Sequence, residues 1–88
     1  MRAVRVHEFG GIQDLHFDTV EDPRPGTGEL VIRIRAIAVN FVDLLVIGGG
    51  YQFLPARPFS PGKLPVGEVI ALGAGVEQFA VGDRVMAL

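Results

Sequence analysis

Residues 30–49 read LVIRIRAIAVNFVDLLVIGG, and two hydrophobic patterns meet within this stretch. In its first half every second residue from Ile32 to Ala38 is apolar, whereas Arg33 and Arg35 fall between them. A period of two is typical of a strand with one buried face, because successive side chains of a strand point to opposite sides. We therefore predict a strand over residues 30–39 that is half-buried on one side.

The second half of the stretch, FVDLLVI (41–47), lacks this alternation. Asn40 is a residue type that caps helices, and the glycines at 48–50 are typical of the place where a helix ends. The sequence therefore predicts a short helix of one or two turns between them.

Asn40 and Asp43 are polar residues within an otherwise apolar run. Burying a polar side chain without partners costs about 1–3 kcal/mol, so the pair should be hydrogen-bonded, exposed in a cleft, or both. Their spacing of three places them on one face of a helix. From the residues alone, Asn40 serves either as a cap or in a site, and Asp43 either as a local acceptor or ion-pair partner or in a site. Tyr51, after three glycines, either anchors the following loop or belongs to the same site.

Before this stretch the chain has the features of a hairpin and a linker. RAVRV (2–6) and LHFDTV (15–20) are rich in β-forming residues and are separated by glycines, which predicts two paired strands. Prolines and glycines indicate that EDPRPGTGE (21–29) is an extended linker and that GGGYQFLPARPFSPGKLP (48–65) is a long loop.

After the loop, VGEVIALG (66–73) and DRVMAL (83–88) are predicted to be strands. GAGVEQ (73–78) resembles the start of a dinucleotide-binding fingerprint, but no sequence suited to the required crossover helix follows it. We therefore favour tight glycine turns between paired strands over a phosphate site, and we expect Phe79 and Val81 to return to the core.

Length and composition indicate one small soluble domain, since 49% of the 88 residues are hydrophobic and 20% are charged. A net charge of −2 argues against a general nucleic-acid binder. No run of about 20 apolar residues is present to span a membrane, and no signal peptide precedes the first strand, so the expected location is the cytoplasm. Residues 30–63 carry four basic residues and only one acid, Asp43, so this part of the chain is locally positive. Such a charge indicates either solvated strand and loop faces or a surface that binds an anionic cofactor or partner.

The chain has no cysteine, and His7 and His16 are its only histidines. A zinc site needs three or four Cys, His, Asp or Glu ligands that converge on one point. The sequence therefore predicts no metal site, and the two histidines are more typical of surface or turn positions.

Several motifs together resemble the N-terminal part of the zinc-independent quinone oxidoreductases of the medium-chain dehydrogenase/reductase superfamily. They are, in order, VHEFGG, DPRPGTGELVIRIRAIAVNFVDLLVIGGGY, PFSPG, VGEVIALGAGV and FAVGDRV. The resemblance covers residues 1–88 and implies a mainly β, GroES-like fold, which is a twisted, partly open β-barrel with one short helix and a long loop. It also implies NADPH as the cofactor, and a Rossmann cofactor domain that these residues do not contain.

The resemblance also implies a set of site residues. In the quinone-reductase branch, residues that match Asn40, Asp43 and Tyr51 line the cleft where nicotinamide and substrate meet, so all three are candidate catalytic residues. Asn40 and Tyr51 are in addition the candidate cofactor-binding residues. The zinc-dependent relatives carry a ligating cysteine at the place of Asn40 and a His-Glu pair at the places of Lys63 and Leu64, so the resemblance too implies no zinc.

The implied activity is zinc-independent hydride transfer from NADPH to an electron-poor quinone or conjugated carbonyl. Residues 1–88 alone are expected to bind NADPH weakly or not at all, because the pyrophosphate site belongs to the Rossmann domain. The alternative is a non-catalytic GroES-like module that binds a partner or forms a homodimer through the open strand edge at Leu88. Neither hypothesis involves nucleic acid or a membrane as partner.

Overall fold

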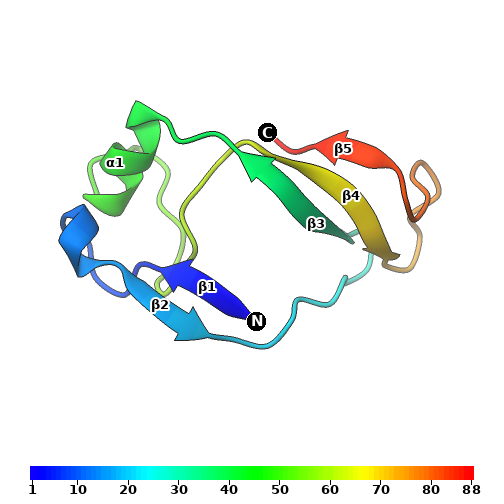
Figure 1. Cartoon of the computed structure of the whole chain (residues 1–88), viewed down its shortest axis with the longest axis horizontal. Coiled ribbons are helices and arrows are strands. Elements are labelled where there is room, and N and C mark those ends of the chain that lie inside the picture. Colours follow the sequence, from blue (N-terminus) through cyan, green and yellow to red (C-terminus); the bar gives the residue numbers. More distant parts are fainter. The chain divides into compact units, whose positions relative to one another are not determined.

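The computed structural model describes residues 1–88 and divides into two compact units. The first unit consists of Met1–Glu21 and Val39–Gly62, and the second of Asp22–Ala38 and Lys63–Leu88. Each unit contains one antiparallel sheet, and the first unit also contains the single α-helix (Figure 1). Neither helical segment has the length or the apolar character that crossing a membrane requires.

The first unit begins with the predicted hairpin. Strand β1 (Arg2–Arg5) pairs antiparallel with β2 (His16–Thr19), so the hairpin is confirmed. Between them lies a short 3₁₀ helix, η1 (Ile12–Asp14), which the sequence analysis did not predict. The Gly11 N–H donates to the Asp14 carboxylate at 3.0 Å, and this bond closes the turn locally.

Helix α1 (Phe41–Ile47) confirms the predicted short helix. Its buried residues, Asp43, Val46 and Ile47, lie three and four positions apart and therefore share one face. The helix ends at Gly48, whose backbone N–H donates to the carbonyl of Leu44 at 3.0 Å.

The core of the first unit joins the helix, the end of the hairpin and the long loop. Val6, Val46, Ile47 and Phe59 form a buried cluster. The loop after α1 is irregular, as predicted, but at Phe59 it forms an isolated antiparallel bridge with Val6. The Val6 N–H donates to the Phe59 carbonyl at 2.7 Å, and the Phe59 N–H donates back at 3.3 Å.

The second unit is a three-stranded antiparallel sheet in the order β3-β4-β5, with β4 in the middle (Figure 1). Its strands are β3 (Leu30–Ile37), β4 (Pro65–Leu72) and β5 (Arg84–Met86). All three predicted strands are confirmed, although the last is shorter than predicted. The expected linker before β3 is irregular, as predicted.

Strand β3 departs from the predicted pattern of burial. Its pairing with β4 is shifted between Val31 and Ile32 and again between Ile34 and Ala36. Between these shifts Ile32, Arg33 and Ile34 pair in unbroken register with Val69, Glu68 and Gly67, so Ile32 and Ile34 share one face, and only Ile32 is partly covered there. The prediction of a strand half-buried along its whole length is therefore wrong, because Ile34 and the residues after it are exposed.

The connection from β4 to β5 contains the predicted glycine turns. Gly75 and Gly82 have φ values of 83° and 98°, a region that glycine adopts readily and other residues rarely do. Phe79 and Val81, however, are 41% and 64% exposed, so the prediction that they return to the core is wrong. A three-stranded sheet buries little surface, and in this unit Val69 alone among large hydrophobic residues is fully buried.

Candidate functional site

Asn40 and Asp43, two of the three candidate residues, are in direct contact at the start of α1. They form the Asp43 half of a capping box, since the Asn40 backbone N–H donates to Asp43 Oδ2 at 2.9 Å. The Asp43 N–H donates to the backbone carbonyl of Asn40 at 3.0 Å, and the Asn40 side chain makes no cap hydrogen bond. Both bonds pair backbone N–H groups that the first turn of a helix would otherwise leave without a partner. The backbone around Asn40 is therefore held from both directions.

Asp43 is the buried polar residue of the chain, with an exposed fraction of 8%. One carboxylate oxygen, Oδ2, caps Asn40, while the other, Oδ1, is buried and has no hydrogen-bond partner in the chain. Leaving a buried acceptor unpaired costs about 1–3 kcal/mol. The carboxylate therefore has the capacity to accept one more hydrogen bond from a donor that reaches the start of the helix.

Tyr51 belongs to the same unit but lies beyond the other end of α1, after the three glycines. Its half-buried ring packs against the cluster of Val6, Val46, Ile47 and Phe59. The structure thus brings Asn40 and Asp43 together and holds Tyr51 on the core beside the same helix. Their roles as catalytic or cofactor-binding residues stay predictions.

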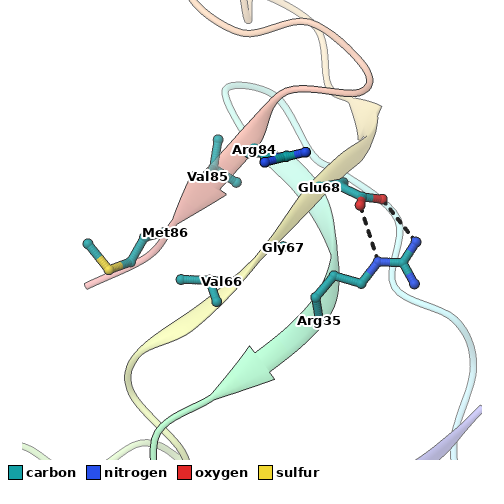
Figure 2. A pocket seen from close by; sticks show the side chains of 7 residues that line it. All are labelled: Arg35, Val66, Gly67, Glu68, Arg84, Val85 and Met86. Carbon is teal, nitrogen blue, oxygen red and sulfur yellow. Dashed lines mark hydrogen bonds and ion pairs between the residues drawn. The ribbon is translucent and has the colours of Figure 1, made fainter.

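The second unit has a feature that the sequence analysis did not identify, a shallow depression of about 630 Å³ on the β4–β5 side of the sheet. Figure 2 shows Arg35 and Glu68 joined by two hydrogen bonds there, with Val66 and Met86 further along the strands. The Arg35 Nε and Nη2 atoms donate to the two oxygens of Glu68 at 3.2 and 3.1 Å. The other lining residues are Val85, Gly67 and Arg84, so Glu68 is the only carboxylate of the depression, and it is bonded to Arg35.

The two partners shift each other's titration in opposite directions. The hydrogen bonds from Arg35 and its charge lower the pKa of Glu68 below its ordinary value, and the charges of Arg33 and Arg84 act in the same direction. The same hydrogen bonds and the charge of Glu68 raise the pKa of Arg35. Both residues are therefore charged near neutral pH.

The two histidines line a second depression, in the first unit. His7 Nε2 lies 2.5 Å from Asp18 Oδ2, and the rings of His7 and His16 meet edge to face at 4.8 Å between centroids. Both histidines are exposed, which confirms the predicted surface positions. The chain contains no group of three or more His, Asp or Glu side chains placed to hold a metal ion.

The buried side of the first unit contains one more residue that the sequence analysis missed. Arg5 is half-buried, its Nη2 donates to the Pro58 carbonyl at 3.0 Å, and its Nε is buried without a partner. Alternation places Arg5 on the face of the strand opposite to Val4 and Val6, so the local pattern predicts an exposed side chain there and gives no sign of the bond to Pro58.

Comparison with known proteins gives a family match for most of the chain. Residues 26–88 match the model of the alcohol dehydrogenase GroES-like domain. The mouse protein named synaptic vesicle membrane protein VAT-1 homolog-like is 44% identical over 87 residues, and the match covers 99% of this chain and 21% of that protein.

Solved structures give the same result. A mycobacterial quinone oxidoreductase superposes with a TM-score of 0.88 at 40% identity, over 98% of this chain and 27% of the other. An Escherichia coli quinone oxidoreductase in complex with NADPH superposes with a TM-score of 0.87 at 29% identity, over 98% of this chain and 26% of the other. The predicted GroES-like fold and the resemblance to quinone oxidoreductases are thus confirmed, and the chain spans about a quarter of the length of these relatives.

Proposed function

Because the chain belongs to the alcohol dehydrogenase GroES-like domain family, we propose that it is the N-terminal part of the catalytic domain of an NADPH-dependent, zinc-independent quinone or enone oxidoreductase. The observation that carries the proposal is the capping box, in which a buried carboxylate fixes the backbone of Asn40. Similarity over almost the whole chain to a quinone oxidoreductase in complex with NADPH supports it. The proposed domain organisation is therefore a GroES-like segment over residues 1–88, with the Rossmann cofactor domain outside them.

NADPH, when bound, supplies the hydride that the electron-poor substrate accepts. In this proposal the protein contributes position and hydrogen bonds. The amide of Asn40 and the phenol of Tyr51 orient the nicotinamide carboxamide or donate to the oxygen on which negative charge develops. A proton from solvent completes the reduction at that oxygen.

The residues of the first unit suit these tasks. Asn40 and Tyr51 are both partly exposed, so a ligand can reach them, and each carries a group that donates and accepts. Hydride transfer needs hydrogen-bonding groups at these places and no reducing side chain, because the reduced nicotinamide carries the reducing electrons. Asp43 acts indirectly, since its Oδ2 holds Asn40.

The proposal is tested with Asn40→Ser in the enzyme that contains this chain. Serine caps a helix about as well as asparagine, so stability should change by less than about 0.5 kcal/mol. It lacks the amide, so kcat/KM for NADPH-dependent reduction of 1,4-naphthoquinone should fall roughly tenfold or more. The matched control is Gln78→Ala, which removes an exposed amide from the β4–β5 connection. Full activity of Asn40→Ser would remove Asn40 from the site.

Binding of NADPH by residues 1–88 alone gives a separate test. We propose that these residues contact the nicotinamide end only, so the pyrophosphate and the 2′-phosphate, which carry the cofactor's charge, have no site on them. Titration calorimetry should therefore detect weak binding or none. Saturable binding at micromolar NADPH would contradict this division of the cofactor between domains.

A second candidate function is self-association without catalysis, and the position of β5 favours it. Strand β5 is an edge of its sheet, and Met86 on it is 64% exposed. Edge strands pair readily with other strands, so a homodimer through this edge is the form the hypothesis takes. Sedimentation equilibrium of the chain distinguishes the two candidates, since a well-behaved monomer counts against self-association.

A further inference from the structure

One face of the sheet in the second unit, which we call the Glu68 face, carries a cluster of arginines. Residues that pair directly across two strands point to the same side of a sheet, and so do residues two apart on one strand. Glu68 pairs with Arg33 of β3 on one side and with Arg84 of β5 on the other. Arg35 reaches the same face, because it is bonded to the Glu68 carboxylate. Three guanidinium groups therefore surround one carboxylate.

The single carboxylate of this face is already occupied. Arg35 donates to both oxygens of Glu68, at 3.2 and 3.1 Å. Arg33 and Arg84 act on Glu68 through their charge, but they make no hydrogen bond or ion pair within the chain. Asp83, the acid next to Arg84, instead accepts from a backbone N–H in the turn before β5 at 2.9 Å. Three positive charges against one negative charge leave the face with a surplus of positive charge.

An apolar surface adjoins these charges. Val66 and Met86 pair directly across β4 and β5, and each lies two residues from a charged residue of the Glu68 face (Figure 2). Met86 is 64% exposed, and Val66 is half-buried. Together with Arg84 they line the depression of about 630 Å³, and small-molecule sites have volumes of about 300–1,000 Å³. The depression therefore places a cation without a hydrogen-bond partner beside an apolar surface.

The spacing and the donors of this surface define the chemistry of a ligand. Arg84 and Met86 are two residues apart on a strand, so their Cα atoms are separated by about 7 Å. A guanidinium donates two parallel hydrogen bonds to a carboxylate, which a neutral group does not match. A molecule with a carboxylate at one end and several carbons behind it can therefore contact both residues at once. A sugar phosphate would instead place polar groups on Val66 and Met86.

We propose that the Glu68 face binds small amphipathic carboxylates, with the carboxylate on the Arg84 guanidinium and the hydrocarbon body on Val66 and Met86. The Arg35–Glu68 ion pair stays intact, because the ligand uses donors that this pair leaves free. The site does not rest on the oxidoreductase function proposed above, whose candidate residues all belong to the first unit.

The probe is octanoate, and two matched ligands each lack one of its parts. 1-Octanol keeps the hydrocarbon body without the charge, and acetate keeps the charge without the body. Each is titrated into the ¹⁵N-labelled chain at pH 7, and the backbone amide signals are followed by NMR. Octanoate should shift the signals of residues 66–68 and 84–86 saturably, with a Kd of about 1 mM that rises with added salt. 1-Octanol should bind there about fivefold more weakly or worse, and acetate should not saturate.

Substitutions at Arg84 test the placement of the carboxylate. Arg84→Gln removes the charge and keeps a polar side chain, so octanoate should bind it about fivefold more weakly or worse. Arg84→Lys keeps the charge without the planar pair of donors, so it should lose less affinity. The matched control is Arg2→Gln, which removes an exposed arginine from β1 of the first unit and should leave the affinity for octanoate unchanged.

Three results would each overturn the proposal. In the first, octanoate leaves the signals of residues 66–68 and 84–86 unshifted. In the second, 1-octanol binds at these residues as tightly as octanoate, which would make the depression an apolar surface without recognition of an anion. In the third, Arg84→Gln binds octanoate as tightly as Arg2→Gln does. If Arg84→Gln fails to fold, the comparison of the three ligands on the wild-type chain decides the question.

Discussion

Asp43 in the first unit and Glu68 in the second are both hydrogen-bonded carboxylates, but their surroundings differ. Asp43 is 8% exposed and accepts from a backbone N–H, whereas the Glu68 side chain is 37% exposed and accepts from Arg35, which is 62% exposed. Water competes for the exposed pair, and holding two long side chains together costs entropy. Of the two carboxylates, only that of Asp43 is buried and bonded to the backbone, so it constrains the chain at the start of the helix.

The two carboxylates also differ in how many of their oxygens are hydrogen-bonded. Both oxygens of Glu68 are bonded to Arg35, but Asp43 Oδ1 is buried and unpaired. An asparagine or serine would cap the backbone without a buried charge. The carboxylate gains in return from the helix dipole, because a negative charge in the first turn of a helix is stabilising.

The largest effect on stability is expected from a substitution at Gly67, which precedes Glu68 in β4. It tests whether the close approach of β3 and β4 stabilises the sheet. A Cβ there would lie 2.0 Å from the Arg33 carbonyl oxygen, and backbone atoms cannot move aside cheaply. Gly67→Ala should therefore lower the free energy of unfolding by about 3 kcal/mol. Urea denaturation followed by far-UV dichroism measures this.

The control for Gly67→Ala is Gly50→Ala, where the nearest atom to a new Cβ is 3.9 Å away. It should change stability by less than about 1 kcal/mol. If the two variants were equally stable, close approach of β3 and β4 would not be what holds the sheet together.

A smaller loss is expected when the buried carboxylate is removed. Asp43→Ala deletes the acceptor of the Asn40 N–H, and loss of such a bond at a helix start costs about 2 kcal/mol. Asp43→Asn keeps an oxygen that can accept this bond, so it should lose less. Denaturation monitored by Tyr51 fluorescence measures both variants. Equal stability of Asp43→Ala and the wild-type chain would remove the distinction between Asp43 and Glu68.

The two carboxylates also differ in how far the sequence could predict their partners. Asn40 and Asp43 are three residues apart, so a helix brings them together whatever the rest of the chain does. Arg35 and Glu68 are separated by 33 residues, and their contact depends on a register that shifts beside Arg35. Hydrophobic alternation indicates a strand but does not show where a bulge falls.

The errors of the sequence analysis have the same origin. The mainly β fold, the hairpin and the helix follow from local patterns, and all three are confirmed. The burial of Ile34, Phe79 and Val81 depends on which surfaces are covered, and all three are exposed. The bond from Arg5 to Pro58 likewise required the path of the long loop.

The smallest expected effect is that of Glu68→Gln, which removes the charge of the exposed pair and keeps its shape. At pH 7 the melting temperature should hardly change, because an exposed ion pair contributes little. Folding lowers the pKa of Glu68 below its ordinary value of 4.5, so whatever the charge contributes is present above that value. The contribution is lost as the pH falls through the lower pKa of the folded chain.

Melting curves of the wild-type chain and Glu68→Gln between pH 7 and pH 3 therefore check both the size and the sign of the effect. Any advantage of the wild-type chain at pH 7 should shrink as the solution is acidified and vanish once Glu68 is protonated in the folded chain. Added salt should reduce the same advantage at pH 7, since the charges are accessible to ions. If Glu68→Gln destabilised the chain as much as Asp43→Ala and the loss did not depend on salt, the Arg35–Glu68 ion pair would be a main source of the stability of the sheet.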